Sequence, residues 1–300
     1  MTDFSHIYFE DRGVLAVSGD DARTFLQGLI SNDVTKVTPE KTIHAALLTP
    51  QGKYLHDFFI AEGPGGRLLM DCDRDRLPDL MKRLKLYKLR AKADLADQSD
   101  QWTVAVFPGA AALPKLGLPD TAGAARIDAG GVVYTDPRLS GMGGRAILPI
   151  NATEKFLAGR GAQLGSRADY DRLRIKLGVP DGIRDLVVDK SILLESGFDE
   201  LNGVDWNKGC YMGQELTART KYRGLIKKRL MPVVIEGDLP EPGAALMLDG
   251  KDAGEMRSAV AAVGGGIGLA LVRLEHLEAG KPLDADGAKV TPIKPDWANF

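Results

Sequence analysis

The chain has 300 residues, which is long for one domain and enough for two or three, each with its own buried core. Hydrophobic residues make up 44% of the sequence and charged residues 27%, as in an ordinary globular protein. The net charge of −2 shows no basic excess, which disfavours a protein that binds tRNA or DNA directly. No stretch approaches the length of uninterrupted apolar sequence that a membrane span requires, so we expect no membrane association.

The two cysteines, Cys72 and Cys210, lie far apart and in different contexts. Cys72 follows the apolar run 68–70 and is expected at the end of a buried strand. Two distant cysteines build neither a disulfide framework nor a complete four-ligand zinc site, and so low a thiol count is typical of a reducing cytosol. The N-terminal sequence shows no signal-peptide pattern and no arginine-rich amphipathic stretch, so we expect a bacterial cytoplasmic protein.

The N-terminal third of the sequence predicts strands that alternate with helices. A strand is expected at 14–18, and Ser18 with Asp21 is typical of a capping box that opens a helix. Residues 45–60 form two apolar runs around the turn residues 50–53, which predicts a hairpin.

Apolar side chains at helical spacing predict an amphipathic helix from Leu77 to Tyr87, capped by Asp73 or Asp75, with Pro78 in its first turn. The opposite face of this helix is basic. Such a face is usually only solvated, and the alternative is that it attracts an acidic partner. Its basic residues are Lys82, Arg83, Lys85, Lys88 and Arg90.

The next segment predicts a small α+β module. Strands are expected at 102–107 and 145–149, and a hairpin at 126–136 that turns at two glycines. Residues 108–120, rich in alanine, proline and glycine, are expected to form a loop. A helix that contains Phe156 follows, and this alternation suits a ferredoxin-like module.

The C-terminal half begins with a helix and ends with strands. Ser166 with Asp169 predicts a second capping box, and its helix should end at Gly178. We expect 181–206 to be an extended surface segment, with Trp206 as a core anchor rather than a platform for a ligand. Short strands that together predict an antiparallel barrel are expected at 228–235, 245–248, 255–263, 267–273 and 289–293.

Cys210 lies in a stretch whose composition suits a reactive or metal-ligating thiol. Gly209 and Gly213 allow a tight turn on either side of it, and a helix is expected at 214–220. The N-terminus of that helix and the Lys208 ammonium group would both favour the thiolate. The alternative is that Cys210 is a small buried hydrophobic residue.

Longer strings of sequence resemble a known family. K-G-C-Y-M-G-Q-E at 208–215, followed by Y-R-G, resembles the signature of the YgfZ-type folate-binding factors of iron–sulfur cluster maturation. G-V-P-D-G-I-R-D-L at 178–186 resembles the branch that contains the mitochondrial assembly factor for [4Fe–4S] proteins. D-A-x-x-F-L-Q-G-L-I-S-N-D-V at 21–34 resembles the opening of the family's folate-binding domain, which a folate-dependent tRNA-modification GTPase shares.

This family shares its fold with the aminomethyltransferase of glycine cleavage, the T-protein. The resemblance therefore implies an α+β fold: a multidomain ring with a ferredoxin-like module and a C-terminal antiparallel β-barrel. It also implies a folate-binding domain at 1–98 that is completed by 166–224, the ferredoxin-like domain at 99–165 and the barrel at 225–300.

The resemblance also implies roles for single residues. Cys210 would act as a thiolate that accepts an oxidised intermediate or ligates a cluster shared with a partner. Lys208, Gln214 and Glu215 would orient the loop around it, and Arg219 would hold Glu215 as an i, i+4 pair. Residues implied in folate binding are Asp57, Asn32, Arg174 and Tyr211. For Asp57, which matches an acidic residue of the T-protein, a solvated strand position is the alternative.

The implied function is that of a folate-binding accessory factor that assembles or repairs iron–sulfur proteins with an A-type cluster carrier. Tetrahydrofolate would be its cofactor, and a [2Fe–2S] cluster would be shared with the carrier. Client iron–sulfur enzymes would be further partners, so any effect on tRNA modification would be indirect.

Two alternatives stay open, although an assembly factor is favoured over a turnover enzyme. A folate-dependent aminomethyl or methyl transferase needs carboxylates around the pterin, and Lys176 stands where the T-protein has one of them. A non-catalytic interaction module would use the Cys210 motif only as a packed turn.

Overall fold

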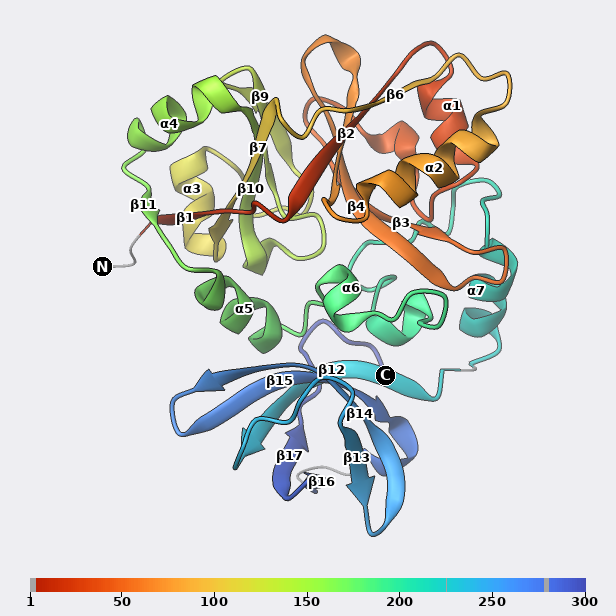
Figure 1. The fold of residues 1–300 in the computed structure, drawn as a ribbon, viewed down its shortest axis with the longest axis vertical. Helices are drawn as coiled ribbons and strands as arrows, with labels where there is room; N and C mark the ends of the chain where they lie inside the picture. The colour runs from red at the N-terminus through yellow and green to blue at the C-terminus, as the bar shows by residue number, and fades with distance from the viewer. Residues whose placement is uncertain (1–3, 225, 278–280) are drawn as a thin grey trace. The chain divides into compact units, whose positions relative to one another are not determined.

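The computed structural model describes residues 4–224, 226–277 and 281–300 (Figure 1). The chain divides into two compact units, and each unit is built from separate stretches of sequence. Unit 1 comprises Met1–Leu48, His56–Arg167 and Asn202–Met212, and unit 2 comprises Thr49–Leu55, Ala168–Leu201 and Gly213–Phe300. The division into three domains stays a prediction.

One sheet of unit 1 carries the predicted hairpin. Its strand order is β3-β4-β5-β2-β6, so the two strands of the hairpin, β3 and β4, are neighbours. At the turn between them, Gly52 adopts a φ of +69°, which glycine tolerates best. Nearly every residue of β3 and β4 is buried, which explains their long apolar runs. The strands are β2 (Arg12–Ser18), β3 (Ile43–Leu48), β4 (Tyr54–Glu62), β5 (Leu68–Asp73) and β6 (Asp94–Asp97).

Two helices accompany this sheet, α1 (Ala22–Gln27) and α2 (Leu77–Lys88). The capping box predicted for the first of them is wrong, because Asp21 makes no side-chain cap. Its carboxylate instead accepts a hydrogen bond from the backbone N–H of Lys92 at 2.8 Å. α2 has Pro78 in its first turn, as predicted, and contacts β2 and β6. It buries Leu77, Leu80 and Leu84.

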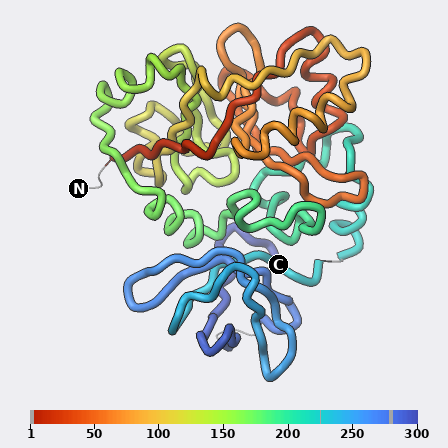
Figure 2. The backbone as a smooth tube through the Cα atoms, in the orientation of Figure 1, coloured from red at the N-terminus to blue at the C-terminus, as the bar shows by residue number. Residues whose placement is uncertain are grey.

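The second sheet of unit 1 includes the N-terminal strand. The order is β11-β1-β7-β10-β9-β8, and β1 pairs antiparallel with β7. The N-terminal segment, red in Figure 2, therefore lies among yellow and green parts of the chain. The predicted hairpin between β8 and β9 is confirmed, with Ala129 and Gly130 at its turn, both at positive φ. The strands are β1 (Ser5–Tyr8), β7 (Trp102–Pro108), β8 (Ala125–Asp128), β9 (Gly131–Thr135), β10 (Gly143–Pro149) and β11 (Gln163–Leu164).

The loop predicted at 108–120 is wrong in part, because it contains a 3₁₀ turn and the short helix α3 (Leu113–Leu116). Ala112, Leu113 and Leu116 are buried against Phe107 of the adjacent strand. Their apolar spacing is helical, and burial of that face outweighs the helix-breaking composition. The helix predicted around Phe156 is α4 (Ile150–Ala158).

Unit 2 contains a closed barrel with the strand order β12-β15-β14-β13-β16-β17, in which neighbouring strands pair antiparallel. β14 and β15 are joined by a tight turn at Gly264, which adopts a positive φ. The core of the barrel comes from its own strands and includes Met231, Leu246, Met256 and Val290. The strands are β12 (Lys228–Glu236), β13 (Ala245–Leu248), β14 (Lys251–Ala262), β15 (Gly265–Arg273), β16 (Leu283–Ala285) and β17 (Ala288–Pro292).

The segment 181–206, predicted to be an extended surface segment, contains short helical turns and is partly buried. It holds α6 (Gly182–Asp185) and the 3₁₀ turn η5 (Leu193–Ser196). Leu193, Leu194, Phe198 and Leu201 are buried, because turns in this segment direct successive apolar residues inward. The remaining helices are α5 (Arg167–Lys176) and α7 (Gln214–Tyr222), and the other 3₁₀ turns are η1 (Val34–Lys36), η2 (Pro64–Gly66), η3 (Ala110–Ala112), η4 (Ser140–Met142) and η6 (Leu274–His276).

Candidate functional site

Residues 202–212, which end with the Cys210 motif, are tied to the end of α1 within unit 1. The backbone N–H of Asp205 donates to the carbonyl oxygen of Ser31 at 3.0 Å, and that of Met212 donates to Gly28 at 3.1 Å. The Ser31 hydroxyl donates to the carbonyl oxygen of Gly203 at 2.6 Å. These bonds fix both ends of the segment on one short stretch of chain.

Lys208 holds the middle of the segment. Its ammonium group donates to the carbonyl oxygens of Gln27 at 2.8 Å, Ile30 at 2.6 Å and Asn32 at 2.8 Å. A lysine has three N–H donors, so these bonds use all of them. The side chain is only 6% exposed, and burial lowers its pKa to about 8. Lys208 therefore anchors the loop through carbonyl groups at and after the end of α1, as the predicted role in orienting the loop requires, and its effect on the thiol stays a prediction.

The anchored loop presents Cys210 at the surface. Cys210 is exposed, and a side chain in place of the neighbouring Gly209 would meet no atom within contact distance. Cys72 is buried in β5, as expected, and burial raises the pKa of its thiol. Cys210 is thus the thiol that a partner or reagent can reach.

The other motif residues lie in α7, which belongs to unit 2. The predicted i, i+4 pair forms, with Arg219 Nη2 at 2.9 Å from Glu215 Oε1, and both side chains are largely exposed. Gln214 is the first residue of the helix. The partition of the chain thus places Cys210 and Lys208 in unit 1, and Gln214, Glu215 and Arg219 in unit 2.

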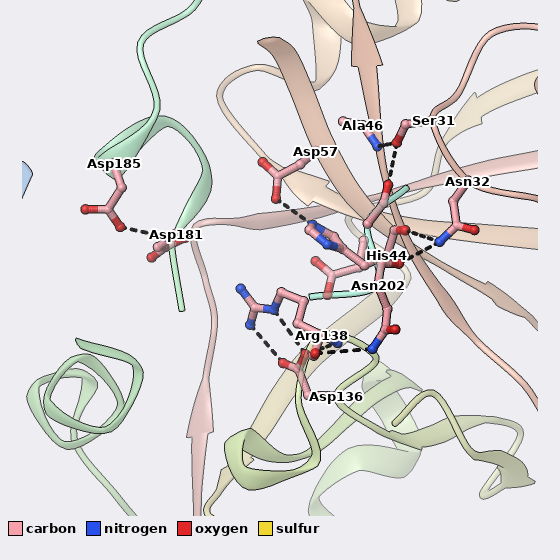
Figure 3. Close-up of polar contacts among 12 residues, drawn as sticks. Ser31, Asn32, His44, Ala46, Asp57, Asp136, Arg138, Asp181, Asp185 and Asn202 are labelled. Atoms are coloured by element: carbon pink, nitrogen blue, oxygen red, sulfur yellow. Dashed lines mark hydrogen bonds and ion pairs between the residues drawn. The ribbon is translucent and has the colours of Figure 1, made fainter. Parts of the chain in front are cut away.

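Asp57 lies in unit 1 as a buried carboxylate, which corrects the alternative of a solvated strand residue. It is on β4, and its Oδ2 lies 3.2 Å from His44 Nε2 on β3 (Figure 3). Burial lowers the pKa of His44, so the imidazole is neutral at physiological pH. Successive side chains of a strand point to opposite faces of the sheet, so the neighbouring His56 points away from His44. Its Nε2 lies 2.9 Å from Asp79 Oδ2 on α2.

Asn32 is fully engaged inside the protein. Its Nδ2 donates to the carbonyl oxygens of His44 and Asn202, each at 2.7 Å, and its Oδ1 accepts from the Asp33 backbone at 2.8 Å (Figure 3). The predicted role of Asn32 as a folate ligand is therefore not supported by its bonding. Its position supports a role in shaping the loop after α1.

Arg174 is engaged in the same way in unit 2. Its Nε donates to Asp171 at 2.7 Å, its Nη1 to Asp185 at 2.6 Å and its Nη2 to the Ser258 hydroxyl at 3.1 Å. The guanidinium group is fully buried among these residues. These contacts join α5 and α6 to the barrel strand β14. Arg174 thus has a structural role, which corrects the prediction that it binds folate. Tyr211 is buried beneath the Lys208 ammonium group, 5.1 Å from its ring centroid.

A buried cluster of arginines near Asp57 was missed by the sequence analysis. Arg138 makes two hydrogen bonds to the Asp136 carboxylate, at 3.0 and 2.8 Å, and its guanidinium lies 4.9 Å from the Phe59 ring (Figure 3). Arg145 lies 4.2 Å from the same ring and pairs with Asp71 at 2.6 Å. The sequence carried a signal for this cluster, because charged residues stand among the apolar residues of β5 and β10.

A polar cleft of about 440 Å³ opens beside the anchored segment in unit 1. Trp206 is half-buried and lines it, which corrects the prediction of a core anchor. Lys36 pairs with Asp205 across the lining. The remaining lining residues are Asn32, Lys41, Thr42, Ile43, Thr121, Ala122, Pro137, Asn202, Val204 and Asn207.

In residues 4–224, 226–277 and 281–300, no group of three or more His, Cys, Asp or Glu side chains is placed to hold a metal ion. Within the same ranges, no helix has the length and apolar character needed to cross a membrane.

Comparison with known structures confirms the predicted fold class. The aminomethyltransferase T of the glycine cleavage system from Bartonella henselae matches with a TM-score of 0.78. The match covers 97% of this chain and 85% of that protein at 16% sequence identity, so it shows the fold alone. Residues 227–300 match the family described as the CAF17 C-terminal beta-barrel domain, which agrees with the closed barrel.

Comparison with known sequences shows the family. The mitochondrial iron–sulfur cluster assembly factor IBA57 of Mus musculus is 33% identical, over 96% of this chain and 84% of that protein. The Homo sapiens protein of the same name is also 33% identical, over 96% of this chain and 83% of its own length. The predicted cytoplasmic location is wrong, because these relatives are named as mitochondrial proteins. Similarity of this extent along both sequences shows that the chain belongs to the IBA57 family of iron–sulfur cluster assembly factors.

Proposed function

We propose that this protein acts in the assembly or repair of iron–sulfur proteins, and that Cys210 is the group through which it acts. The names of its relatives support the pathway. The observation that carries the role of Cys210 is its exposure on a segment held by Lys208, while the other cysteine is buried. An exposed thiol on an anchored loop can meet a partner with little loss of conformational entropy.

In the proposed chemistry, Cys210 ligates an iron–sulfur cluster that is passed on to other proteins and is not a resident cofactor. Cys210 loses its proton and supplies one thiolate ligand, and a [2Fe–2S] cluster needs further ligands. This sequence contains just one other cysteine, and that cysteine is buried. The remaining ligands would come from an A-type carrier protein, and the loop would keep the thiolate directed outward.

Anaerobic cluster reconstitution with a purified A-type carrier tests this proposal. The wild-type chain should form a coloured heterodimer, detected by visible absorption and size-exclusion chromatography. Cys210→Ala should lose the cluster, whereas the matched control Cys72→Ala should keep it. An identical coloured complex with Cys210→Ala would show that Cys210 is not a ligand. If this chain bound the cluster in the absence of the carrier, the proposal that the carrier supplies the remaining ligands would be wrong.

Binding of tetrahydrofolate rests mainly on Asp57 among the four implied residues. Asn32 and Arg174 fit the role less well, because every side-chain nitrogen of both residues already donates to a protein group and Arg174 is fully buried. Asp57 fits better, since a buried carboxylate beside a neutral imidazole can accept N–H groups of a pterin.

A calorimetric titration with tetrahydrofolate tests that part of the proposal. Wild type should bind, Asp57→Asn should bind about tenfold or more weakly, and the surface variant Asp238→Asn should match wild type. Equal binding by Asp57→Asn would exclude the site at Asp57. A one-carbon transfer assay on the same samples tests the transferase alternative, against which Lys176 counts.

A further inference from the structure

A groove of about 650 Å³ lies on the outer side of α2 in unit 1. Its floor is mainly apolar, with Leu77, Met81 and Leu86 along the helix. Figure 1 shows α2 lying over the strands of its sheet with this helix uncovered by other elements of the unit. Pro78, Lys82, Lys85 and Asp97 complete the lining.

α2 has a second apolar side besides the one that it buries. Leu86 is 66% exposed and Leu89, at its C-terminal end, is 88% exposed. A helix that packs only on its own sheet needs one apolar stripe, and Leu77, Leu80 and Leu84 already supply it. Large exposed side chains grouped beside a groove are typical of an interaction surface.

The rim of the groove is positively charged. Lys82 and Lys85 line it, and neither makes an ion pair within the part of the chain that the structure describes. Their neighbours Arg83 and Lys88 are paired, with Asp79 at 2.7 Å and Asp94 at 4.0 Å respectively. Two unpaired lysines against the single carboxylate of Asp97 leave the lining positively charged, which favours a ligand with acidic residues beside an apolar stripe.

We propose that this groove binds an amphipathic helix of a partner protein, with leucine-like residues on the groove floor and acidic residues on its rim. A helix laid into a groove alongside another helix buries such a stripe completely. The proposal does not depend on Cys210 or on the cluster chemistry.

Two other occupants fit the surface less well. An anionic membrane surface is flat, so it would leave the concave floor unfilled. A second copy of this chain, docked about a twofold axis, would bring the two basic rims together. An acidic helix satisfies both the shape and the charge.

A fluorescence anisotropy titration of the full-length chain tests the proposal. The probe is a labelled peptide of about 18 residues with leucine at i, i+3, i+4 and i+7 and glutamate at most other positions. The control peptide has the same composition in scrambled order, so its charge is equal but its apolar stripe is lost. Wild type should bind the patterned peptide at least about tenfold more tightly than the scrambled one.

Variants locate the binding. Lys82→Glu/Lys85→Glu and Leu86→Asp should each weaken binding about tenfold or more. The control Lys251→Glu/Lys289→Glu, on exposed barrel positions of unit 2, changes the net charge equally and should leave binding unchanged. Equal binding of the two peptides, or an equal effect of both lysine pairs, would overturn the proposal. So would binding to phosphatidylglycerol vesicles without peptide binding, or a dimer that Leu86→Asp abolishes.

Discussion

Lys208 is the residue on which the position of Cys210 depends. Its ammonium group satisfies three carbonyl oxygens after α1, where the backbone has no helical partners of its own. The bonds are charge-assisted and buried, so each is stronger than an exposed hydrogen bond. The loop therefore owes its shape to one side chain two positions before the thiol.

Replacement of Lys208 by methionine should leave three buried carbonyl groups without donors. We expect the free energy of unfolding to fall by about 3 kcal/mol. Hydrogen exchange should locate the change, with faster exchange at the amides of Asp205 and Met212. Lys190→Met, at an exposed lysine, is the matched control. Unchanged exchange at both amides would show that the loop holds its shape without Lys208.

His56 should make stability depend on pH. Burial, followed by the charge of Arg76, lowers the pKa of His56 to about 4, whereas the unfolded chain titrates near 6.5. Between these values the unfolded state binds more protons, so the free energy of unfolding falls as the pH falls. At pH 5 the loss from His56 is on the order of 2 kcal/mol.

Urea denaturation of wild type and His56→Gln at pH 7 and pH 5 measures this contribution. Glutamine can still bond to Asp79 but does not titrate, so the variant should lose less stability between the two pH values. His44 and His6 are also buried with lowered pKa values, and they remain in both proteins. Parallel losses in the two proteins would assign the pH dependence to those other groups.

The sequence predicted the part of the site that depends on neighbouring residues. The Glu215 and Arg219 pair follows from local spacing and is present. Of the two glycines predicted to allow a tight turn, Gly213 adopts a positive φ, whereas residues 209–211 form no regular turn. The partners of Lys208 were not predictable, because backbone carbonyls far away in the sequence carry no side-chain signal. The cluster of Arg138, Asp136 and Phe59 was missed for a different reason, because Phe59 lies far from the other two in the sequence and only the fold brings the three side chains together.

At the scale of elements, α5, α6 and β14 are joined by one buried polar network. Arg174 on α5 pairs with Asp185 on α6 at 2.6 Å, and both contact the Ser258 hydroxyl on β14. Asp185 also accepts from the backbone N–H of Asp181 at 2.8 Å. Because every member of the network has a hydrogen-bond partner, the network holds α5 and α6 in place against β14.

Asp185→Ala should cost about 3 to 5 kcal/mol of stability, because it leaves the Arg174 charge buried and short of partners. Chemical denaturation measures the loss. Asp100→Ala, at a largely exposed ion pair with Arg74, should cost well under about 1 kcal/mol. A similar small cost at Asp185 would mean that water or other groups compensate for the lost carboxylate.

Elements with strong periodicity were predicted well, and elements defined by distant pairing were not. The β3–β4 hairpin, α2 and the barrel strands follow from apolar alternation and turn residues. β1 and β6 are short and polar, and they are strands because β7 and β2 offer hydrogen-bond partners. α3 and α6 were missed because their composition argues against helix. Burial of Leu113 and Leu116 favours α3, and the hydrogen bonds of the buried Asp185 favour α6.

At the scale of the whole molecule, the barrel is built from one continuous stretch of sequence, from β12 to β17. Its sheet is closed, so among the described residues it leaves no unpaired edge, and its core comes from its own strands. Unit 1, in contrast, includes residues 202–212, which are separated in the sequence from the rest of the unit by residues 168–201 of unit 2.

Residues 227–300 alone should therefore fold, with a small stability of about 3 to 5 kcal/mol. Residues 1–167 alone should not reach a native state, since they lack Lys208 and the bonds from 202–212 to Ser31 and Gly28. Circular dichroism melting and analytical ultracentrifugation of both fragments measure the difference. A monomeric 1–167 fragment with a cooperative transition would contradict the second expectation.

The placement of 202–212 in unit 1 also sets the order in which the molecule matures during synthesis. The ribosome completes the two sheets of unit 1 long before it makes this segment. Until then the carbonyl groups after α1 have no lysine to bind. The last piece that completes the unit is the one that carries Cys210, so a nascent chain displays its outward thiol only when its own scaffold is finished.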